Sequence, residues 1–431
     1  MRILPRALVV LLASASGLAQ PPRAHISPTI SALQHAVGKR TPGAEAAFWA
    51  RVEREGAPIV ELIPGDTANV LYTFVWRGDS ATRHVALINA AVASQVPAEA
   101  LLARVPGTDV WYRSYHSRAD ARFVYELSPN DDLIPWERVT DWRARTATFR
   151  RDPFNSKVFQ AAIVGRGQSY VEGPRAPKEE WLAERPGVAK GRIEQTTFTS
   201  NLLGTAREVW IYTPAGYDTL ARRGEGLPLL MTFDGGLYTT SLPAPTILDN
   251  MIAARRIAPM IGVFVGWPPG QRDAELGMNQ RYVEFLATEL MPWVRSKYAV
   301  ASSPRGNVVA GSSLGGLAAA FVAHRHPELF GNVLSQSGAF MLGAAGDSTP
   351  ERLTRELAAA PRRELRFYLE AGIYETGRFE NGVDLLTSNR HLRDALRAKG
   401  YPVTYDEFAG GHSDLNWRSG FARGLLALLG R

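Results

Sequence analysis

Apolar and polar residues alternate in blocks along the second half of the chain. From about residue 192, short apolar runs of strand length are separated by longer stretches in which apolar residues recur at helical spacing. The clearest helical stretches are 284–298 and 389–400. Because strands that alternate with helices form parallel sheets covered on both faces, the pattern predicts an α/β domain over 192–431. Its predicted strands are 207–214, 227–235, 259–266, 307–311, 332–338, 365–372 and 402–410.

The first half of the chain has a different pattern. Gly-Asp, Pro-Gly and Pro-Asn turn formers separate four β-rich runs, at 70–78, 83–90, 110–116 and 121–128. Strands at this spacing predict a small β-sandwich domain over 44–165, with helical spacing at its start. Residues 20–42 resemble a loose leader, and 166–191 are rich in Gly, Pro and charge, so we expect the linker between the two domains there.

The first residues have the order of parts found in a secretory signal peptide. Arg2 and Arg6 form a basic region, 7–13 is a short apolar region, and 17–19 ends in a small residue. We therefore expect 1–19 to be a signal peptide and the protein to be periplasmic or secreted. The chain has no Cys, which excludes disulfides, a lipoprotein cysteine and thiolate chemistry.

Composition narrows the function classes. A chain of 431 residues is longer than one ordinary hydrophobic core can serve, in keeping with two domains. The formal net charge of +7 favours an anionic ligand or surface, although a genome that prefers Arg is the simpler explanation. No basic run carries interleaved aromatic residues, so we expect no nucleic-acid partner. No further apolar segment is long enough for a membrane span.

The segment 306–330 (GNVVAGSSLGGLAAAFVAHRHPELF) carries the strongest chemical signal. Residues 311–315 match G-x-S-x-G between a predicted strand and a predicted helix, which is the arrangement of a nucleophile elbow. Small neighbours permit the sharp turn, and the serine hydroxyl then lies above the strand ends near a helix N-terminus. We predict that Ser313 is a nucleophile.

A serine nucleophile needs an adjacent base, and four histidines follow Ser313. His324 and His326 lie on the helix after the elbow, and His391 begins an amphipathic helix. His412 follows the last predicted strand and a Gly-Gly pair, where a base is expected. We predict that His412 is the base.

The acid that orients the histidine should follow the strand at 365–372. Glu375 lies just beyond that strand, and we predict that it is the acid. Asp384 and Glu370 are alternatives, the second still within the strand. Asp406 and Asp414 lie close to His412 in the chain, and the acid of such a triad is usually not found so near its histidine.

An oxyanion hole requires two N–H donors. One should be the amide of Leu314, directly after the nucleophile. The other should come from the glycine-rich segment 233–240, where Gly236 or its neighbour Leu237 is the candidate. No H-E-x-x-H, EF-hand or P-loop pattern is present, and the inferred chemistry requires no metal or cofactor.

Several segments together resemble the enterochelin (enterobactin) esterase family of esterase D-like α/β-hydrolases. In the second half these are RDAEL (272–276), FLATELMPWV, GSSLGG, HPELFGNVLSQSG, EAGIYE and GGHSDLNWRSGF. Before the linker, FWARVEREGAPIVE, YTFVWRG, PGTDVWY, DARFVYELSPND and DPFN are similar to the N-terminal β domain of those esterases. The resemblance covers about 44–430 and implies an α/β-hydrolase domain preceded by a small all-β sandwich domain.

The resemblance implies hydrolysis of a trilactone catecholate siderophore such as ferric enterobactin, with Ser313, His412 and Glu375 in the places of nucleophile, base and acid. Arginine and aromatic side chains would hold the anionic ferric catecholate, because guanidinium groups pair with phenolate oxygens and stack on rings. The candidates from the matching motifs are Arg272, Trp417, Arg418 and Trp111.

Two features leave alternatives open. The best-known siderophore trilactone esterases act in the cytoplasm, whereas this chain has a predicted signal peptide. The same scaffold also carries feruloyl and acetyl-xylan esterases, so a carbohydrate-linked ester is an alternative substrate. A siderophore-binding protein with little activity and an acyltransferase are alternatives of other classes.

Overall fold

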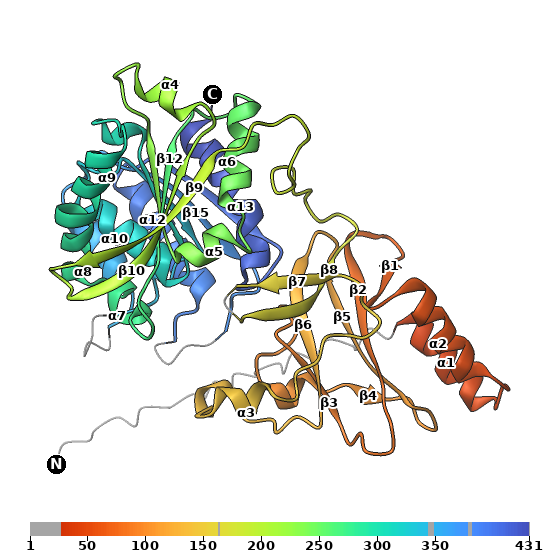
Figure 1. Cartoon of the computed structure of the whole chain (residues 1–431). Helices are drawn as coiled ribbons and strands as arrows, with labels where there is room; N and C mark the ends of the chain where they lie inside the picture. The colour runs from red at the N-terminus through yellow and green to blue at the C-terminus, as the bar shows by residue number, and fades with distance from the viewer. Residues whose placement is uncertain (1–26, 163, 344–348, 378–381, 431) are drawn as a thin grey trace, which may run out of the picture.

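The computed structural model describes residues 27–162, 164–343, 349–377 and 382–430. The predicted signal peptide, 1–19, lies outside these residues. The chain forms a β domain followed by a larger domain with a central sheet and helices on both faces (Figure 1). Within the described ranges, no helix is both long and apolar enough to cross a bilayer.

The N-terminal domain consists of two four-stranded antiparallel sheets, with strand orders β1-β2-β5-β4 and β3-β6-β8-β7. Aromatic residues such as Tyr72, Phe74, Phe123 and Tyr125 fill the space between the sheets. The strands are β1 (Ile59–Ile63), β2 (Asp66–Arg77), β3 (Val85–Ile88), β4 (Ala103–Arg104), β5 (Val110–Arg118), β6 (Arg122–Pro129), β7 (Val158–Ala161) and β8 (Arg166–Glu172). The helices are α1 (Pro28–Gly38), α2 (Ala44–Glu55), η1 (Pro97–Ala100), η2 (Trp136–Arg138) and α3 (Trp142–Thr146).

Two boundaries differ from the sequence prediction. Residues expected to be a loose leader form α1, because Ser27 caps its N-terminus and Ile30 and Leu33 are buried against α2 and its neighbours. Residues 166–172, assigned to the linker, form β8, whose residues 169–172 pair in antiparallel register with 122–125 of β6. Glycine and the charged ends of this strand hid its pattern, since only Gln168, Ser169 and Val171 are buried, and the linker begins after β8.

The C-terminal domain is built on an eight-stranded sheet of order β16-β15-β14-β13-β11-β12-β10-β9. The strands from β16 to β12 are parallel, and β10 and β9 are antiparallel additions at one edge. This confirms the predicted α/β class. The strands are β9 (Arg192–Ser200), β10 (Thr205–Thr213), β11 (Leu229–Phe233), β12 (Ile261–Val265), β13 (Val308–Ser312), β14 (Asn332–Gln336), β15 (Arg366–Gly372) and β16 (Val403–Phe408).

Two apolar cores cover the faces of this sheet. Alternate residues of one strand point to opposite faces, so Leu229 and Met231 of β11 join one core and Leu230 joins the other. The first core includes α7 (Arg272–Leu276), α8 (Gln280–Phe285), η3 (Leu286–Leu290), α9 (Met291–Lys297), α10 (Leu314–Arg325), α11 (Arg352–Ala359) and α12 (Leu385–Ala398). The second includes α5 (Gly235–Thr239), α6 (Ala244–Ala253) and α13 (Asp414–Leu429). The short α4 (Tyr217–Ala221) and η4 (Pro304–Gly306) lie in connections.

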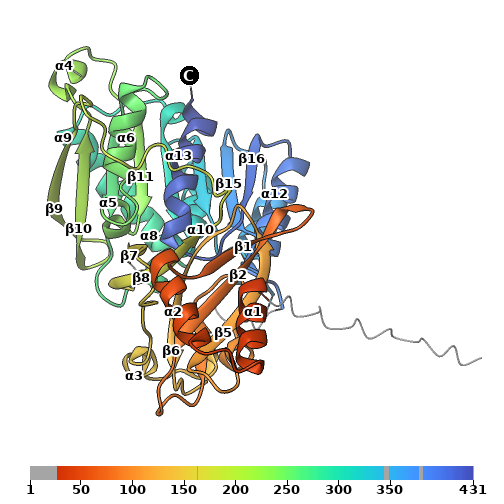
Figure 2. The same cartoon turned by 90° about the vertical axis from the view of Figure 1, so that its right-hand side faces the viewer.

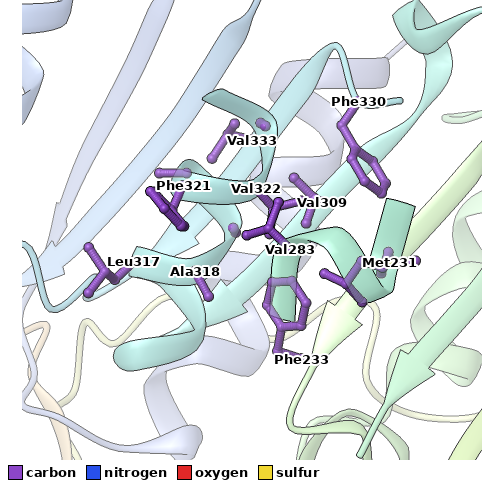
Figure 3. Packing of buried hydrophobic residues seen from close by; sticks show 14 of the residues in the cluster. Met231, Phe233, Val283, Val309, Leu317, Ala318, Phe321, Val322, Phe330 and Val333 are labelled. Atoms are coloured by element: carbon purple, nitrogen blue, oxygen red, sulfur yellow. The ribbon is translucent and has the colours of Figure 1, made fainter. Parts of the chain in front are cut away.

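Helix α10 is buried against the centre of the sheet (Figure 3). Leu317, Phe321 and Val322 of this helix pack in one cluster with Val309 of β13 and Phe233 of β11. A helix buried on nearly all sides explains the Ala-rich sequence after the elbow, because small side chains let α10 approach the strands. The packing fixes the start of α10, where Ser313 lies.

A polar network lies inside the second core, between β15 and α13. Glu370 is fully buried; Gln336 Nε2 donates to its Oε1 at 2.6 Å, and Tyr368 OH donates to its Oε2 at 2.9 Å. Arg423 Nη2 lies 3.3 Å from Oε2. The lack of a side chain at Gly420 makes room for this carboxylate, since a Cβ there would lie 1.8 Å from Oε1.

Burial raises the pKa of Glu370 from 4.5 to about 7, against the opposing effect of Arg423 and the hydrogen-bond donors. Because the folded state favours the protonated acid, its contribution to stability is fully present below pH 4.5 and is lost as the pH rises through 7. Relative to Glu370→Gln, which stays neutral, the wild-type free energy of unfolding should fall by about 3 kcal/mol across this window. Urea unfolding of both proteins at several pH values measures the difference, and the exposed Glu364→Gln serves as control. Parallel pH profiles would contradict the assignment.

Candidate active site

Ser313 occupies a strained turn between β13 and α10. Its backbone has φ 59° and ψ −123°, a conformation that costs an L-residue about 1–3 kcal/mol. Ser313 N–H donates to Gln336 O at 2.9 Å, and Ser313 O accepts from Ala339 N–H at 3.0 Å. A Cβ at Gly311 would lie 2.3 Å from the backbone of Gly315, so the turn requires glycine there. The Ser313 side chain makes no capping hydrogen bond to its own helix, which leaves the hydroxyl available for chemistry.

Glu375 and His412 are hydrogen-bonded to each other. Glu375 Oε1 lies 2.9 Å from His412 Nδ1, and Glu375 Oε2 accepts from Gly372 N–H at 2.8 Å. The Glu375 side chain is 2% exposed, whereas that of His412 is 40% exposed. A carboxylate on Nδ1 fixes the tautomer with a free Nε2, which is the nitrogen that a general base uses. The ring centroids of His412 and Trp417 lie 4.9 Å apart with an interplanar angle of 87°, an edge-to-face contact that supports the imidazole from a second side.

The sheet topology gathers the three predicted catalytic residues. Ser313, Glu375 and His412 follow β13, β15 and β16, whose carboxyl ends lie on the same edge of the parallel sheet. Among the hydrogen bonds of the described residues, none joins Ser313 Oγ to the His412 ring. Contacts of this kind commonly tighten only in the substrate complex. The structure therefore shows a direct hydrogen bond between the acid and the base. The serine is brought to the same edge of the sheet by the strand that precedes it.

Two backbone N–H groups at the starts of α5 and α10 have no backbone acceptor among the described residues. Leu237 N–H donates to Asp234 O at 2.8 Å, so this candidate is already engaged. Within the described part of the chain, no backbone hydrogen bond uses Gly236 N–H or Leu314 N–H. A Cβ added to Gly236 would meet nothing within 4 Å. Of the two alternatives in the glycine-rich segment, Gly236 is the one free to bind an oxyanion with Leu314.

Asp234 joins the glycine segment to the rim of the site. It accepts from Arg272 Nε and Nη2 at 2.6 and 2.7 Å and from Trp267 Nε1 at 2.7 Å. Asp234 Oδ2 also lies 3.3 Å from where a Cβ on Gly315 would be, beside the start of α10. Arg272, predicted to bind substrate, thus spends two nitrogens on Asp234, and its side chain stays 25% exposed. Its role toward substrate stays a prediction.

Three other predicted substrate-binding residues are placed differently by the structure. Trp111 is 8% exposed and packs in the core between the β sheets, and Trp417 is 1% exposed beneath His412. Trp417 Nε1 donates to Ser337 Oγ at 3.0 Å. Arg418 makes a two-pronged ion pair with Glu179, at 2.8 and 2.6 Å, and stacks over the Phe159 ring. The prediction is wrong for both tryptophans, because burial keeps them from a ligand, and the charge of Arg418 is already paired.

The sequence analysis missed Trp267. This side chain is 43% exposed, follows β12, and is held by the Asp234 carboxylate next to the oxyanion segment. An aromatic residue at the carboxyl end of a strand, directly before a Pro-Pro-Gly turn, was the available signal.

A cavity of about 750 Å³ lies in the other domain, lined by residues of α1, α2 and nearby strand ends such as Trp49, Arg77 and Asp109. Arg77 stacks 4.3 Å over the Trp49 ring, and Trp49 Nε1 donates to Asp109. Helices α1 and α2 are on the side of the β domain that faces away from the catalytic domain (Figures 1 and 2). This cavity is therefore separate from the site around Ser313.

Known proteins resemble the chain across both domains. Residues 71–182 match the family described as "Enterochelin esterase, N-terminal", and residues 200–428 match the family described as "Putative esterase". The iron(III) enterobactin esterase of Dickeya dadantii (strain 3937) is 31% identical over 89% of this chain and 93% of that protein. The iron(III) enterobactin esterase of Escherichia coli (strain K12) is 29% identical over 75% of this chain and 80% of that protein.

Solved structures agree with the sequence relatives. The ferric enterobactin esterase of Salmonella typhimurium superposes with a TM-score of 0.73 at 26% identity, covering 89% of this chain and 98% of that one. The structure of the enterobactin esterase of Shigella flexneri in the presence of enterobactin has a TM-score of 0.70 at 26% identity. It covers 90% of this chain and 98% of that one. With matches to both domains and a hydrogen-bonded Glu375–His412 pair beside the Ser313 elbow, this chain is a carboxylic ester hydrolase that belongs to the enterochelin (enterobactin) esterase family.

Proposed function

We propose that this protein is a serine esterase that hydrolyses the trilactone ester bonds of a catecholate siderophore such as ferric enterobactin. The observation that carries the proposal is the hydrogen bond between Glu375 and His412 at the strand ends next to the strained Ser313 turn. The named activity of relatives that align with both domains supports the choice of ester.

In the proposed mechanism, Ser313 Oγ attacks the ester carbonyl while His412 Nε2 takes its proton. Glu375 holds the imidazole by Nδ1 and stabilises the imidazolium that forms. The N–H groups of Leu314 and Gly236 donate to the tetrahedral oxyanion. The alkoxide of the leaving group receives the proton from His412, and water then releases the acid from the acyl-enzyme by the same steps in reverse.

The rim of the site suits an anionic aromatic ligand. Trp267 is 43% exposed, and Arg272 donates to the same Asp234 carboxylate, which fixes its orientation. An indole held by its own N–H can stack on a catechol ring at little cost in side-chain entropy, because it is already ordered. The positive net charge of the chain favours approach of an anionic ferric complex.

The N-terminal sequence supports export as part of the proposal. With 1–19 as a signal peptide, the enzyme would act in the periplasm or outside the cell. The siderophore would then be opened before it reaches the cytoplasm.

The carbohydrate-ester alternative expects an exposed aromatic face on the β domain. Trp111 is buried, and Trp76 and Tyr115 pack against the same core, so these three residues form no such face. One observation still favours a test of this alternative. Trp142 is 56% exposed, and its ring stacks on that of Trp136 with a centroid distance of 6.0 Å and an interplanar angle of 7°. A feruloylated sugar therefore belongs in the substrate panel.

Incubation of the mature protein with ferric enterobactin should release dihydroxybenzoylserine, and Ser313→Ala should lower turnover by roughly a thousandfold or more because the nucleophile is lost. Glu375→Gln should cost less than Ser313→Ala, up to about 10,000-fold, because Trp417 still supports the His412 ring. Chromatography of the products measures both.

The matched control is Asp384→Asn. Asp384 caps α12 by accepting from Thr387 N–H, and Asn caps as well, so this variant should keep wild-type turnover. Activity retained in Ser313→Ala would overturn the nucleophile. Release of ferulate alone would move the function to cell-wall esters, binding without any product would favour a siderophore-binding protein, and ester exchange onto an added alcohol would indicate an acyltransferase.

Trp267→Ala should raise KM for ferric enterobactin about 2- to 10-fold, because it removes the stacking face. Turnover of a small ester such as p-nitrophenyl acetate should change little. Trp267→Phe keeps an aromatic ring and should lie between wild type and Trp267→Ala. An equal loss of kcat on both substrates would instead assign Trp267 to support of Asp234 and the oxyanion segment.

A further inference from the structure

The loop that carries His412 is held from outside its own domain. Arg122 N–H, at the start of β6 in the β domain, donates to Ala409 O at 2.9 Å. On the same side, a Cβ at Gly411 would lie 2.9 Å from the Ala91 side chain, so a segment of the β domain is packed directly on the loop. The position of the loop therefore depends on the docked β domain.

Asp414, two residues after His412, adds a buried contact between this segment and the β domain. Its carboxylate is in a residue only 2% exposed, and Oδ2 accepts from Ala162 N–H of the β domain at 3.0 Å. The same oxygen accepts from Ser241 Oγ at 2.5 Å. Ser241 follows α5, the helix that begins with the oxyanion segment. One buried oxygen thus joins the β domain, the histidine loop and the oxyanion side of the site.

The chemistry of Asp414 favours a positioning role. No ion pair among the described residues gives this buried carboxylate a cationic partner, so it is held by neutral donors and by the N-terminus of α13. Leu415 next to it is fully buried against Val124, Phe159 and Ala161 of the β domain. A buried carboxylate costs free energy, and it keeps its place only where its hydrogen bonds are all formed.

The segment that carries the acid, Glu375, is also attached to the β domain. Tyr374, directly before Glu375, exchanges a hydrogen bond with Ser117 of β5, and its ring packs on the core of the β domain. Both halves of the Glu375–His412 pair are thus anchored to the β domain through their sequence neighbours.

We propose that the N-terminal β domain sets the position of the catalytic histidine, and that Asp414 is the positioning residue that transmits it to His412 and the oxyanion segment. This inference rests on the proposed Ser313–His412–Glu375 mechanism. It goes beyond that mechanism by assigning the β domain a part in turnover as well as any part in substrate binding.

The test compares Asp414→Ala and Asp414→Asn with wild type in the full-length mature protein. Asp414→Ala should lower kcat about 10- to 100-fold, because displacement of a catalytic group by about 1 Å costs on this order. KM should stay within about threefold, since the carboxylate does not line the ligand surface. Asn retains an acceptor oxygen for Ala162 N–H or Ser241 and should recover most of kcat. Assays on ferric enterobactin and p-nitrophenyl acetate should show the same kcat ratio.

The control is Asn250→Ala, which removes the hydrogen bonds that Asn250 Nδ2 of α6 donates to Trp181 O and Ala183 O of the linker at 2.8 and 2.9 Å, without touching the histidine loop. It should lower the melting temperature but leave kcat unchanged. Wild-type kcat in Asp414→Ala, or an equal kcat loss in Asn250→Ala, would overturn the proposal. If Asp414→Ala fails to fold, Ser117→Ala decides the question: a lower kcat at unchanged KM supports the proposal, and wild-type kcat overturns it.

The Ser313→Ala variant distinguishes failure of the positioning proposal from failure of the proposed catalytic mechanism. If it is inactive while Asp414→Ala is fully active, the positioning role fails and the mechanism stands. If Ser313→Ala is active, both fail.

Discussion

The backbone of Ser313 is held in a conformation that an isolated chain avoids, and the architecture around it supplies what keeps it there. Gly311 and Gly315 leave room for strand and helix to meet, Gln336 and Ala339 hydrogen-bond both sides of the serine, and α10 is buried in the core. A turn that costs about 1–3 kcal/mol survives only when its surroundings determine it completely. The parallel sheet provides those surroundings and also delivers the other two residues to the same edge.

Buried carboxylates then set the geometry around the turn. Glu375 holds the imidazole, Asp234 holds Trp267 and Arg272 beside the oxyanion segment, and Asp414 ties the histidine loop to the β domain. Each carboxylate is charge-paired or satisfied by several donors, which is the condition for burial. The site is thus a set of separate loops, each held by a buried carboxylate. These loops are therefore ordered before substrate binds.

Much of this could be predicted locally. Apolar periodicity predicted the α/β class, and the small residues around Ser313 predicted the elbow, because both depend on neighbours in sequence. Strand order made His412 and Glu375 the best base and acid. The strand β8 and the helix α1 were missed, since the sequences of both are polar on one side and are ordered by partners far along the chain.

The sequence by itself determined which residues can do chemistry and in which order along the chain they follow the strands. Only the tertiary structure decided which side chains are available to a ligand. Trp417 and Trp111 lie in motifs that match the family and Trp267 does not, yet packing buries the first two and leaves Trp267 exposed. Likewise, Asp414 was dismissed as the acid from its position, and only docking of the β domain reveals what it contacts. Availability depends on which surfaces cover each other, and that is a property of long-range contacts that no local pattern encodes.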